Sequence, residues 1–142
     1  MLIGDYCAYR ERCHSEVRTR LFDYGMTPSE ADELMMELIT GDFLNEERFA
    51  RAFARGKFLH NKWGKRKIVS HLKKKSISEV CIKLGLQEID EEAYTKLLHV
   101  LLERKSGELK IKNQFTKNRK VADYLIRKGF ESERVWDILR KG

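Results

Sequence analysis

Three segments of this chain align without gaps, and this repetition constrains the fold more than any other feature of the sequence. The segments read VRTRLFDYGM (17–26), IVSHLKKKSI (68–77) and VADYLIRKGF (121–130). Each opens with Val or Ile and has Leu four positions later, which places both side chains on one face of a helix. Each then has Gly25, Ser76 or Gly129, where a helix that ends in left-handed backbone favours glycine. The pattern predicts three equivalent helices, and Ser76 ends its helix at some conformational cost.

A second phrase occurs twice, as FLNEERFARAF (43–53) and as EIDEEAYTKLL (88–98). Asn45 and Asp90 are good N-cap residues, because a short side-chain oxygen can accept hydrogen bonds from the free N–H groups of a first helical turn. The two glutamates after each cap lie where the helix dipole favours negative charge. An aliphatic residue before each cap and an aromatic residue four positions after it have the spacing of a hydrophobic staple. We therefore predict two further helices, over about 45–60 and about 90–105.

A third helix is expected after each copy of the first repeated segment. Thr27 is followed by proline at the first helical position and by Glu30 at the third, which is the pattern of a capping box. Ser78 can cap the equivalent helix of the second copy. The third copy has Glu131 in this place, so its cap is weaker or moves to Ser132.

These patterns predict an all-α fold, namely an elongated array of three tandem three-helix repeats that together form one elongated domain. The repeats are expected at 1–43, 44–88 and 89–142, and the first has a shortened opening helix. A unit of this size cannot bury its apolar face alone, so stacking on its neighbours completes the core. The chain has a single proline, Pro28, among many Lys, Arg, Glu and Leu residues, and this composition also favours helices.

The positive charge of the chain is concentrated in two stretches. The net charge is +7, from 29 Lys and Arg against 22 Asp and Glu, which favours a polyanion or an acidic protein surface as partner. No acidic residue occurs from Lys62 to Ser78, and a second excess of cations covers 110–128. If the units stack in register, these cations form a basic stripe; the alternative is a solvated face without a partner. The candidate partner-binding residues are Lys57, Lys62, Lys65, Arg66, Lys67, Lys73, Lys74, Lys75, Lys117, Arg119, Lys120, Arg127 and Lys128.

Motifs for catalysis or cofactor binding are missing from the sequence. There is no P-loop or GxGxxG motif, and no serine or cysteine has an evident base and orienting group. We therefore predict no catalytic residue, no cofactor and no metal. Cys7, Cys13 and His14 come closest to a metal site, but their spacing places the two cysteines on different faces of a helix. Trp63 and Phe58 flank the basic stretch, and they can stack on nucleic-acid bases or pack internally, which is commoner.

The N-terminal sequence has no apolar stretch long enough for a signal peptide, and no membrane span follows it. A cytoplasmic protein is therefore expected, without contact to a membrane. In that compartment Cys7, Cys13 and Cys81 would be reduced thiols.

The segment DFLNEERFARAFARGKFLHNKWGKRKIVSHLKKKSIS (42–78) resembles the signature of the RecX family, bacterial regulators of the RecA recombinase. Its matching residues are Leu44, Asn45, Arg48, Phe49, Ala50, Trp63, Gly64, Ile68, Leu72 and Ile77. The closing YLIRKGFESERVWDIL (124–139) is similar to the C-terminal repeat of the family, and SEVRTRL (15–21) to its first-repeat helix. The resemblance covers nearly the whole chain, and Ser76 stands where glycine is usual.

This resemblance implies a non-enzymatic protein that binds filaments of RecA on single-stranded DNA and lies along the filament groove. Such a protein is expected to limit filament growth, ATP hydrolysis, strand exchange and the coprotease activity of RecA in the SOS response. We expect a monomer whose basic face meets the filament, with weak direct contact to DNA and with each unit on a successive protomer. Reversing Lys65, Arg66 and Lys67 to glutamate should then keep the helical content and remove inhibition.

Two other functions fit the same residues. A helical-repeat protein can bind single-stranded or double-stranded nucleic acid directly through its basic face, and Trp63 adds some support to this alternative. A protein-only adaptor would instead recognise an acidic partner without any DNA. Titration of single-stranded DNA with and without RecA separates the functions, since a direct binder holds bare DNA tightly and leaves RecA ATPase unchanged.

Overall fold

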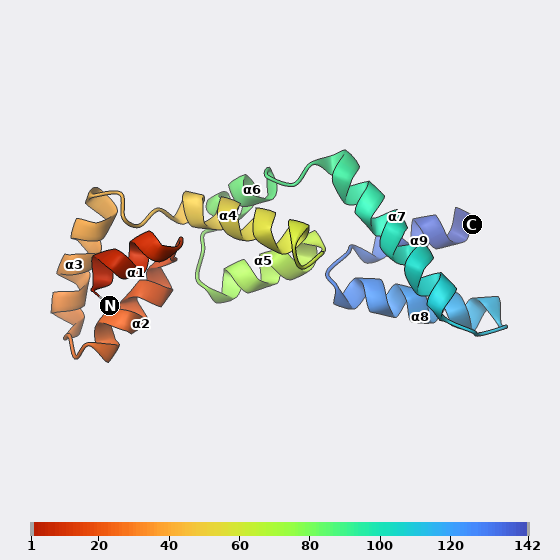
Figure 1. Cartoon of the computed structure of the whole chain (residues 1–142), viewed down its shortest axis with the longest axis horizontal. Helices are drawn as coiled ribbons and strands as arrows, with labels where there is room; N and C mark the ends of the chain where they lie inside the picture. The colour runs from red at the N-terminus through yellow and green to blue at the C-terminus, as the bar shows by residue number, and fades with distance from the viewer. Residues whose placement is uncertain (1, 142) are drawn as a thin grey trace.

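The computed structural model describes residues 2–141, and within this range the chain forms nine helices and no strand. The helices are α1 (Ile3–Tyr9), α2 (His14–Asp23), α3 (Pro28–Thr40), α4 (Glu46–Leu59), α5 (Lys65–Lys74), α6 (Glu79–Leu86), α7 (Glu91–Glu108), α8 (Gln114–Arg127) and α9 (Ser132–Lys141). They are arranged as three groups of three along a rod, with the N-terminus at one end and the C-terminus at the other (Figure 1). The all-α, elongated array is confirmed. Residues 1 and 142, the outer limits of the predicted array, lie outside the described residues.

The repeated helix starts are explained by side-chain caps. The side chain of Asn45 accepts from the N–H of Arg48 over 2.9 Å, and that of Asp90 accepts from the N–H of Ala93 over 2.9 Å. Thr27 forms the predicted capping box at the start of α3. These oxygens satisfy N–H groups that have no partner inside a helix. The two helices predicted from the doubled phrase are therefore confirmed, and the second, α7, extends three residues further than expected, to Glu108.

The three repeated segments end their helices in the same way. Gly25, Ser76 and Gly129 all have left-handed backbone, with φ of 85°, 62° and 104°. In each copy the N–H of the following apolar residue then donates to the carbonyl of the repeated leucine, which is the geometry of a Schellman cap. These bonds join Met26 to Leu21 (3.2 Å), Ile77 to Leu72 (3.2 Å) and Phe130 to Leu125 (3.1 Å).

The apolar faces of these helices are buried in two separate clusters. One cluster belongs to α1–α3 and includes Val17 and Leu21; the other is continuous through α4–α9 and includes Phe49 and Tyr94. The staple predicted for the first doubled phrase is not made, because Leu44 joins the first cluster while Phe49 lies in the second. Since α4–α9 share one core, the predicted repeat limits near residues 44 and 89 stay a prediction.

The second helices of the three groups lie end to end. The N–H of Gly64, just before α5, donates to the carbonyl of Lys128, just after α8, over 2.7 Å, and the N–H of Arg66 donates to the carbonyl of Gly129 over 2.9 Å. At the other end of α5, the hydroxyl of Ser15 in α2 donates to the carbonyl of Lys75 over 3.1 Å. The helices α8, α5 and α2 therefore follow one another with parallel dipoles along the lower side of the rod in Figure 1.

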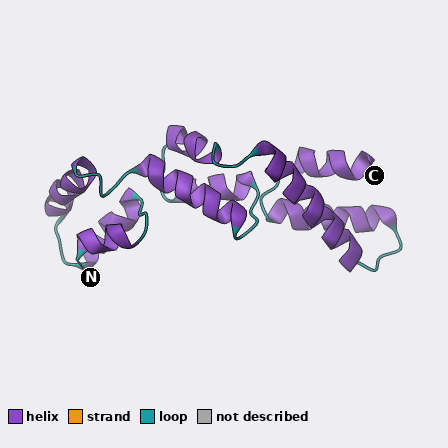
Figure 2. Ribbon diagram, turned by 45° about the horizontal axis from the view of Figure 1, so that its top comes forward, coloured by secondary structure: helices purple, strands orange, loops and turns teal. Residues whose placement is uncertain are grey.

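Figure 2 shows the same succession from another angle, with short loops joining the helices and α4 and α7 crossing above the row. The row matters for function because α5 and α8 carry most of the candidate partner-binding residues. Their alignment satisfies the condition on which the predicted basic stripe depends, namely that the units stack in register.

Candidate functional site

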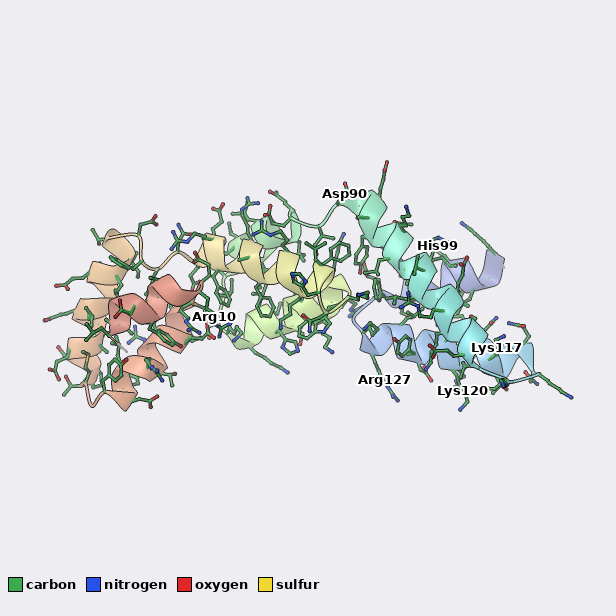
Figure 3. The ribbon with its side chains drawn as sticks, viewed as in Figure 1. Arg10, Asp90, His99, Lys117, Lys120 and Arg127 are labelled. Carbon is green, nitrogen blue, oxygen red and sulfur yellow. The ribbon has the colours of Figure 1, made fainter. Side chains whose placement is uncertain are left out.

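The candidate site is a cationic face along α5 and α8. Its members are solvent-exposed cations that make no ion pair within residues 2–141: Lys62, Arg66, Lys73, Lys74, Arg119, Lys120 and Arg127. Lys117 is half-buried and is also without an ion pair in this part of the chain. Lys120 and Arg127 extend outward from α8 on the lower side of Figure 3, away from α7. Unpaired cations of this kind keep their full charge for a partner, and they belong to both of the aligned helices.

Two other candidate residues hold the groups of helices together. The ammonium of Lys65 lies 2.8 Å from the carboxylate of Glu91 and 4.5 Å from the ring centre of Tyr94. The ammonium of Lys75 lies 3.4 Å from the carboxylate of Glu16 in α2. Both lysines are half-buried. The structure therefore gives Lys65 and Lys75 internal partners at the two ends of α5, which could not be read from their membership in a basic run.

Trp63 is the centre of a packed group of cations and rings. The ammonium groups of Lys57 and Lys67 lie 5.0 and 4.5 Å from the centre of its ring, which is cation–π geometry. Its ring also packs against His71 at 4.5 Å. Burial, followed by the charges of nearby lysines, lowers the pKa of His71. Phe58 is buried in the core and is not available to stack on a base.

Cations from two groups of helices meet where α8 ends and α5 begins. The ammonium of Lys128 donates to the carbonyl of Asn61 over 3.4 Å and lies near the ring of Tyr124. Burial lowers the pKa of Lys128, and the positive charges of Lys67 and Lys62 lower it further. The lowered pKa is the electrostatic sign that these lysines lie close enough to repel one another. An anion placed here would relieve that repulsion.

Two open hollows on this face share Arg66 and Ser70. One, of about 740 Å³, has Val69 and Leu86 as apolar lining and Lys73 and Lys74 among its cations. The other, of about 420 Å³, lies against the end of α8 and includes Arg127 and Phe130. The first hollow also has Glu131 in its lining. Cationic side chains outnumber this carboxylate and lie beside apolar ones, and such a surface suits a polyanion that also presents apolar groups.

Several cations elsewhere on the rod are neutralised by acidic neighbours. Arg51 pairs with Glu47 and Glu88, at 3.0 and 3.3 Å, and Arg55 pairs with Glu88 at 3.0 Å. Arg134 pairs with Glu91 and Glu131 in the same way. These ion pairs contrast with the cationic face, but Lys83, Lys96 and Arg104 on α6 and α7 are also exposed and make no ion pair among the described residues. Sequence reasoning missed this difference, because the partners of Arg51 and Arg55 include one that is more than thirty residues away.

The charge also differs between the predicted repeats. Residues 44–88 contain 12 Lys and Arg against 4 Asp and Glu, and residues 89–142 contain 13 against 9. Residues 1–43 contain 4 against 9, so this end of the rod is acidic, with a net charge of −5. Counting charges within each predicted repeat would have revealed this from the sequence alone.

Other kinds of site are not evident in residues 2–141. No group of three or more His, Cys, Asp or Glu side chains is placed to hold a metal ion there. Cys7 and Cys13 are buried free thiols, and burial raises the pKa of both. None of the described helices combines the length and the apolar character needed to cross a lipid bilayer.

The fold and the cationic face together define a helical-repeat protein with an extended cationic surface. Its residues 45–86 match the family model of the second three-helix domain of RecX, and residues 91–139 match that of the third. The chain belongs to the RecX family of regulatory proteins.

Relatives and solved structures are similar to the chain over most of its length. It is 33% identical over 93 residues to regulatory protein RecX of Lactobacillus johnsonii, 27% over 128 residues to that of Bacillus cytotoxicus and 28% over 131 residues to that of Pelodictyon phaeoclathratiforme. These matches cover 66%, 90% and 91% of the chain, which spans 34%, 47% and 80% of the respective relatives. The crystal structure of RecX from Lactobacillus salivarius superposes with a TM-score of 0.87 at 21% identity, over 98% of this chain and 90% of that one. This likeness shows the fold.

Proposed function

We propose that the chain regulates RecA by binding along filaments of RecA on single-stranded DNA. Binding would limit filament growth, and with it ATP hydrolysis, strand exchange and the coprotease activity that triggers the SOS response. The proposal places a non-enzymatic monomer in the cytoplasm, where its thiols remain reduced. Membership in a family of regulatory proteins supports this function, and the cationic face supplies a surface for it.

The observation that carries the proposal is the row of unpaired cations on end-to-end helices. Arg66, Lys73 and Lys74 on α5 and Arg127 on α8 are exposed and unpaired in the described part of the chain. A row of charges suits a partner whose own charges repeat along a line, as phosphates do along a nucleic acid. Each group of helices can touch a successive protomer, so weak contacts combine through their high effective concentration.

A second candidate function is direct binding of nucleic acid by the same face. The absence of acidic residues from Lys62 to Ser78 favours it, because that stretch adds no repulsion toward phosphates. The half-buried Trp63 gives less support, since its ring is already packed against lysines and a histidine. The candidates differ in whether bare DNA is enough for tight binding.

The experiment is a RecA ATPase assay on single-stranded DNA with this protein added at substoichiometric amounts. The test variant combines Arg66→Glu, Lys73→Glu and Lys74→Glu, which are exposed positions without internal partners. This variant is preferred to the charge reversal of Lys65, Arg66 and Lys67. Loss of the contacts of Lys65 and Lys67 would also disturb packing. A control with Lys83→Glu, Lys96→Glu and Arg104→Glu changes the net charge equally at exposed positions on α6 and α7.

We expect the wild type and the control to inhibit the ATPase. The α5 variant should need at least a tenfold higher concentration for the same inhibition. Binding to the filament should weaken steeply with salt, and the α5 variant should reduce the slope against log salt by about 2, because three contacts to single-stranded phosphate are lost. Equal inhibition by the test and control variants would show that the interface lies elsewhere. Tight binding of bare DNA without any effect on the ATPase would instead favour the second candidate function.

A further inference from the structure

Helix α3 contains no Lys or Arg, and its outer face combines acidic with apolar side chains. Glu33, Met36 and Glu37 lie at positions i, i+3 and i+4, so they share one helix face. This face is opposite to the buried residues of the same helix, which include Met35 and Leu38. Met36 is 64% exposed, and Ile39 beside it is 39% exposed. The face is therefore both acidic and apolar.

Exposed apolar side chains are concentrated at this end of the molecule. Eleven large apolar side chains are exposed among the residues whose burial the structure describes, and six of them lie in the first 43 residues. The six are Leu2, Phe22, Tyr24, Met36, Ile39 and Phe43. Helix α3, which carries Met36 and Ile39, lies at the end of the rod formed by the first group of helices (Figure 1).

The arginines at this end of the rod interact with other groups of the same chain. Arg18 pairs with Asp32 at 2.5 Å, and Arg12 is buried and donates to the carbonyl of Tyr6. By contrast, Glu33 and Glu37 are exposed and make no ion pair within residues 2–141. With 4 Lys and Arg against 9 Asp and Glu in residues 1–43, the charge that α3 offers to a partner is negative.

This charge excludes the phosphates of a nucleic acid as the occupant, because like charges repel at contact distance. The partner must carry positive charge, and it must offer apolar surface to cover Met36 and Ile39. A protein surface meets both conditions. We propose that the outer face of α3, formed by Glu33, Met36, Glu37 and Ile39, docks on a basic protein surface that has an apolar centre.

The inference rests on the proposed function and adds a second kind of contact to it. On a RecA filament the cationic face of α5 and α8 meets phosphates, whereas α3 meets a protomer of the protein coat. The two surfaces lie at different places along the same rod, so together they fix which way the rod points on the filament. The α3 face also favours the filament over bare DNA, since bare DNA has no surface for it.

The test measures binding of labelled protein to single-stranded DNA alone and to RecA filaments on the same DNA. One variant carries Glu33→Lys and Glu37→Lys, and a second carries Met36→Ser; all three positions are exposed. A control with Glu92→Lys and Glu103→Lys makes the same change in net charge on α7, where both residues are exposed and make no ion pair among the described residues. Circular dichroism verifies that every variant retains its helices.

We expect both α3 variants to bind filaments at least fivefold more weakly than wild type, while the α7 control does not. The α3 and α7 double variants should bind bare DNA equally. Both change the net charge by the same amount, and bare DNA does not contact the α3 face. Equal filament binding by these two variants would overturn the inference and leave the proposed function standing. Absence of filament binding by the wild type would overturn both. Self-association of the wild type in sedimentation, lost in the α3 variants, would assign the face to a second copy and also overturn it.

Discussion

The N–H of Gly64 donates to the carbonyl oxygen of Lys128 over 2.7 Å, and this bond joins the start of α5 to the end of α8. The contact leaves no room for a side chain. A Cβ atom at Gly64 would lie 2.2 Å from the carbonyl carbon of Gly129, far inside van der Waals contact. The alignment of two helices that carry the cationic face therefore depends on a residue without a side chain.

Gly64→Ala is expected to destabilise the protein by about 3 kcal/mol, because the backbones must separate and the hydrogen bonds between α5 and α8 weaken. Chemical denaturation followed by circular dichroism measures this. Gly56→Ala is the control, since an added Cβ in the middle of α4 meets nothing within 4 Å. That change should stabilise the helix by about 0.5–1 kcal/mol. Similar effects of the two substitutions would show that the junction is not tightly packed.

Tyr94→Phe tests the hydrogen bonds that join α5, α7 and the start of α9. The hydroxyl of Tyr94 accepts from the N–H of Lys65 over 3.0 Å and donates to the carboxylate of Glu131. Removing it leaves the N–H of Lys65 without this acceptor and Glu131 with Arg134 as its remaining partner, in a partly buried place, which costs about 1–3 kcal/mol. Denaturant midpoints should show this loss, whereas Tyr124→Phe, at a half-buried ring, should change stability by less than about 0.5 kcal/mol. If Tyr94→Phe left the stability unchanged, water would have replaced the hydroxyl.

Ser76 offers a reciprocal test of the left-handed helix end. Its φ of 62° is unfavourable for a residue with a side chain, so Ser76→Gly should stabilise the protein by about 1 kcal/mol. Gly25 has the equivalent place in the first copy, with φ of 85° and no atom within 4 Å of an added Cβ. Gly25→Ser should therefore cost a similar amount for conformational reasons alone. Thermal unfolding measures both changes: the melting temperature should rise for Ser76→Gly and fall for Gly25→Ser.

The features that the sequence predicted correctly are those fixed by neighbours along the chain. Asn45 and Asp90 cap helices because the groups they satisfy lie three residues away. Val17 and Leu21 share a buried face because a helix repeats every 3.6 residues, and the equivalent pairs in the other copies obey the same rule. The left-handed ends at Gly25 and Gly129 follow from the backbone freedom of glycine, and the one at Ser76 was predicted from its alignment with them.

The candidate site could not be predicted to the same depth, because it depends on which distant groups meet. Lys65 and Arg66 are adjacent in the sequence, yet Lys65 pairs with Glu91 and Arg66 remains free of ion pairs in the described chain. No local pattern distinguishes these two cations. Leu44 likewise joined the N-terminal core instead of pairing with Phe49, since the position of the connecting segment decides its neighbours.

Glu91 should make the stability depend on pH. Hydrogen bonds from Lys65 and Arg134 lower the pKa of Glu91 in the folded protein. The stabilisation is therefore complete above the unfolded value of about 4.3 and is lost as pH falls through the lower folded pKa. Glu91→Gln should cost about 0.5 kcal/mol at pH 7, because exposed ion pairs are screened, and nothing near pH 2.5. Urea denaturation across this range measures the difference, with Glu92→Gln as the control.

His71 should couple binding of a polyanion to protonation. Burial lowers the pKa of His71, and the charges of Lys74, Lys67, Lys57 and Lys75 lower it further. The side chain is therefore neutral at pH 7. A bound polyanion offsets the lysine charges and raises the pKa, so that binding takes up a proton. Affinity for single-stranded DNA should consequently increase as pH falls from about 7 to about 5.5, by at most tenfold per pH unit for one proton.

Anisotropy of labelled single-stranded DNA at constant ionic strength measures this dependence. His71→Gln should flatten it, because the imidazole that gains the proton is gone. His99 on α7 lies on the other side of the rod from α8 (Figure 3), so His99→Gln should keep the wild-type dependence. If both variants retained the same slope, the polyanion would not lie over α5, because a charge placed there cannot avoid acting on His71.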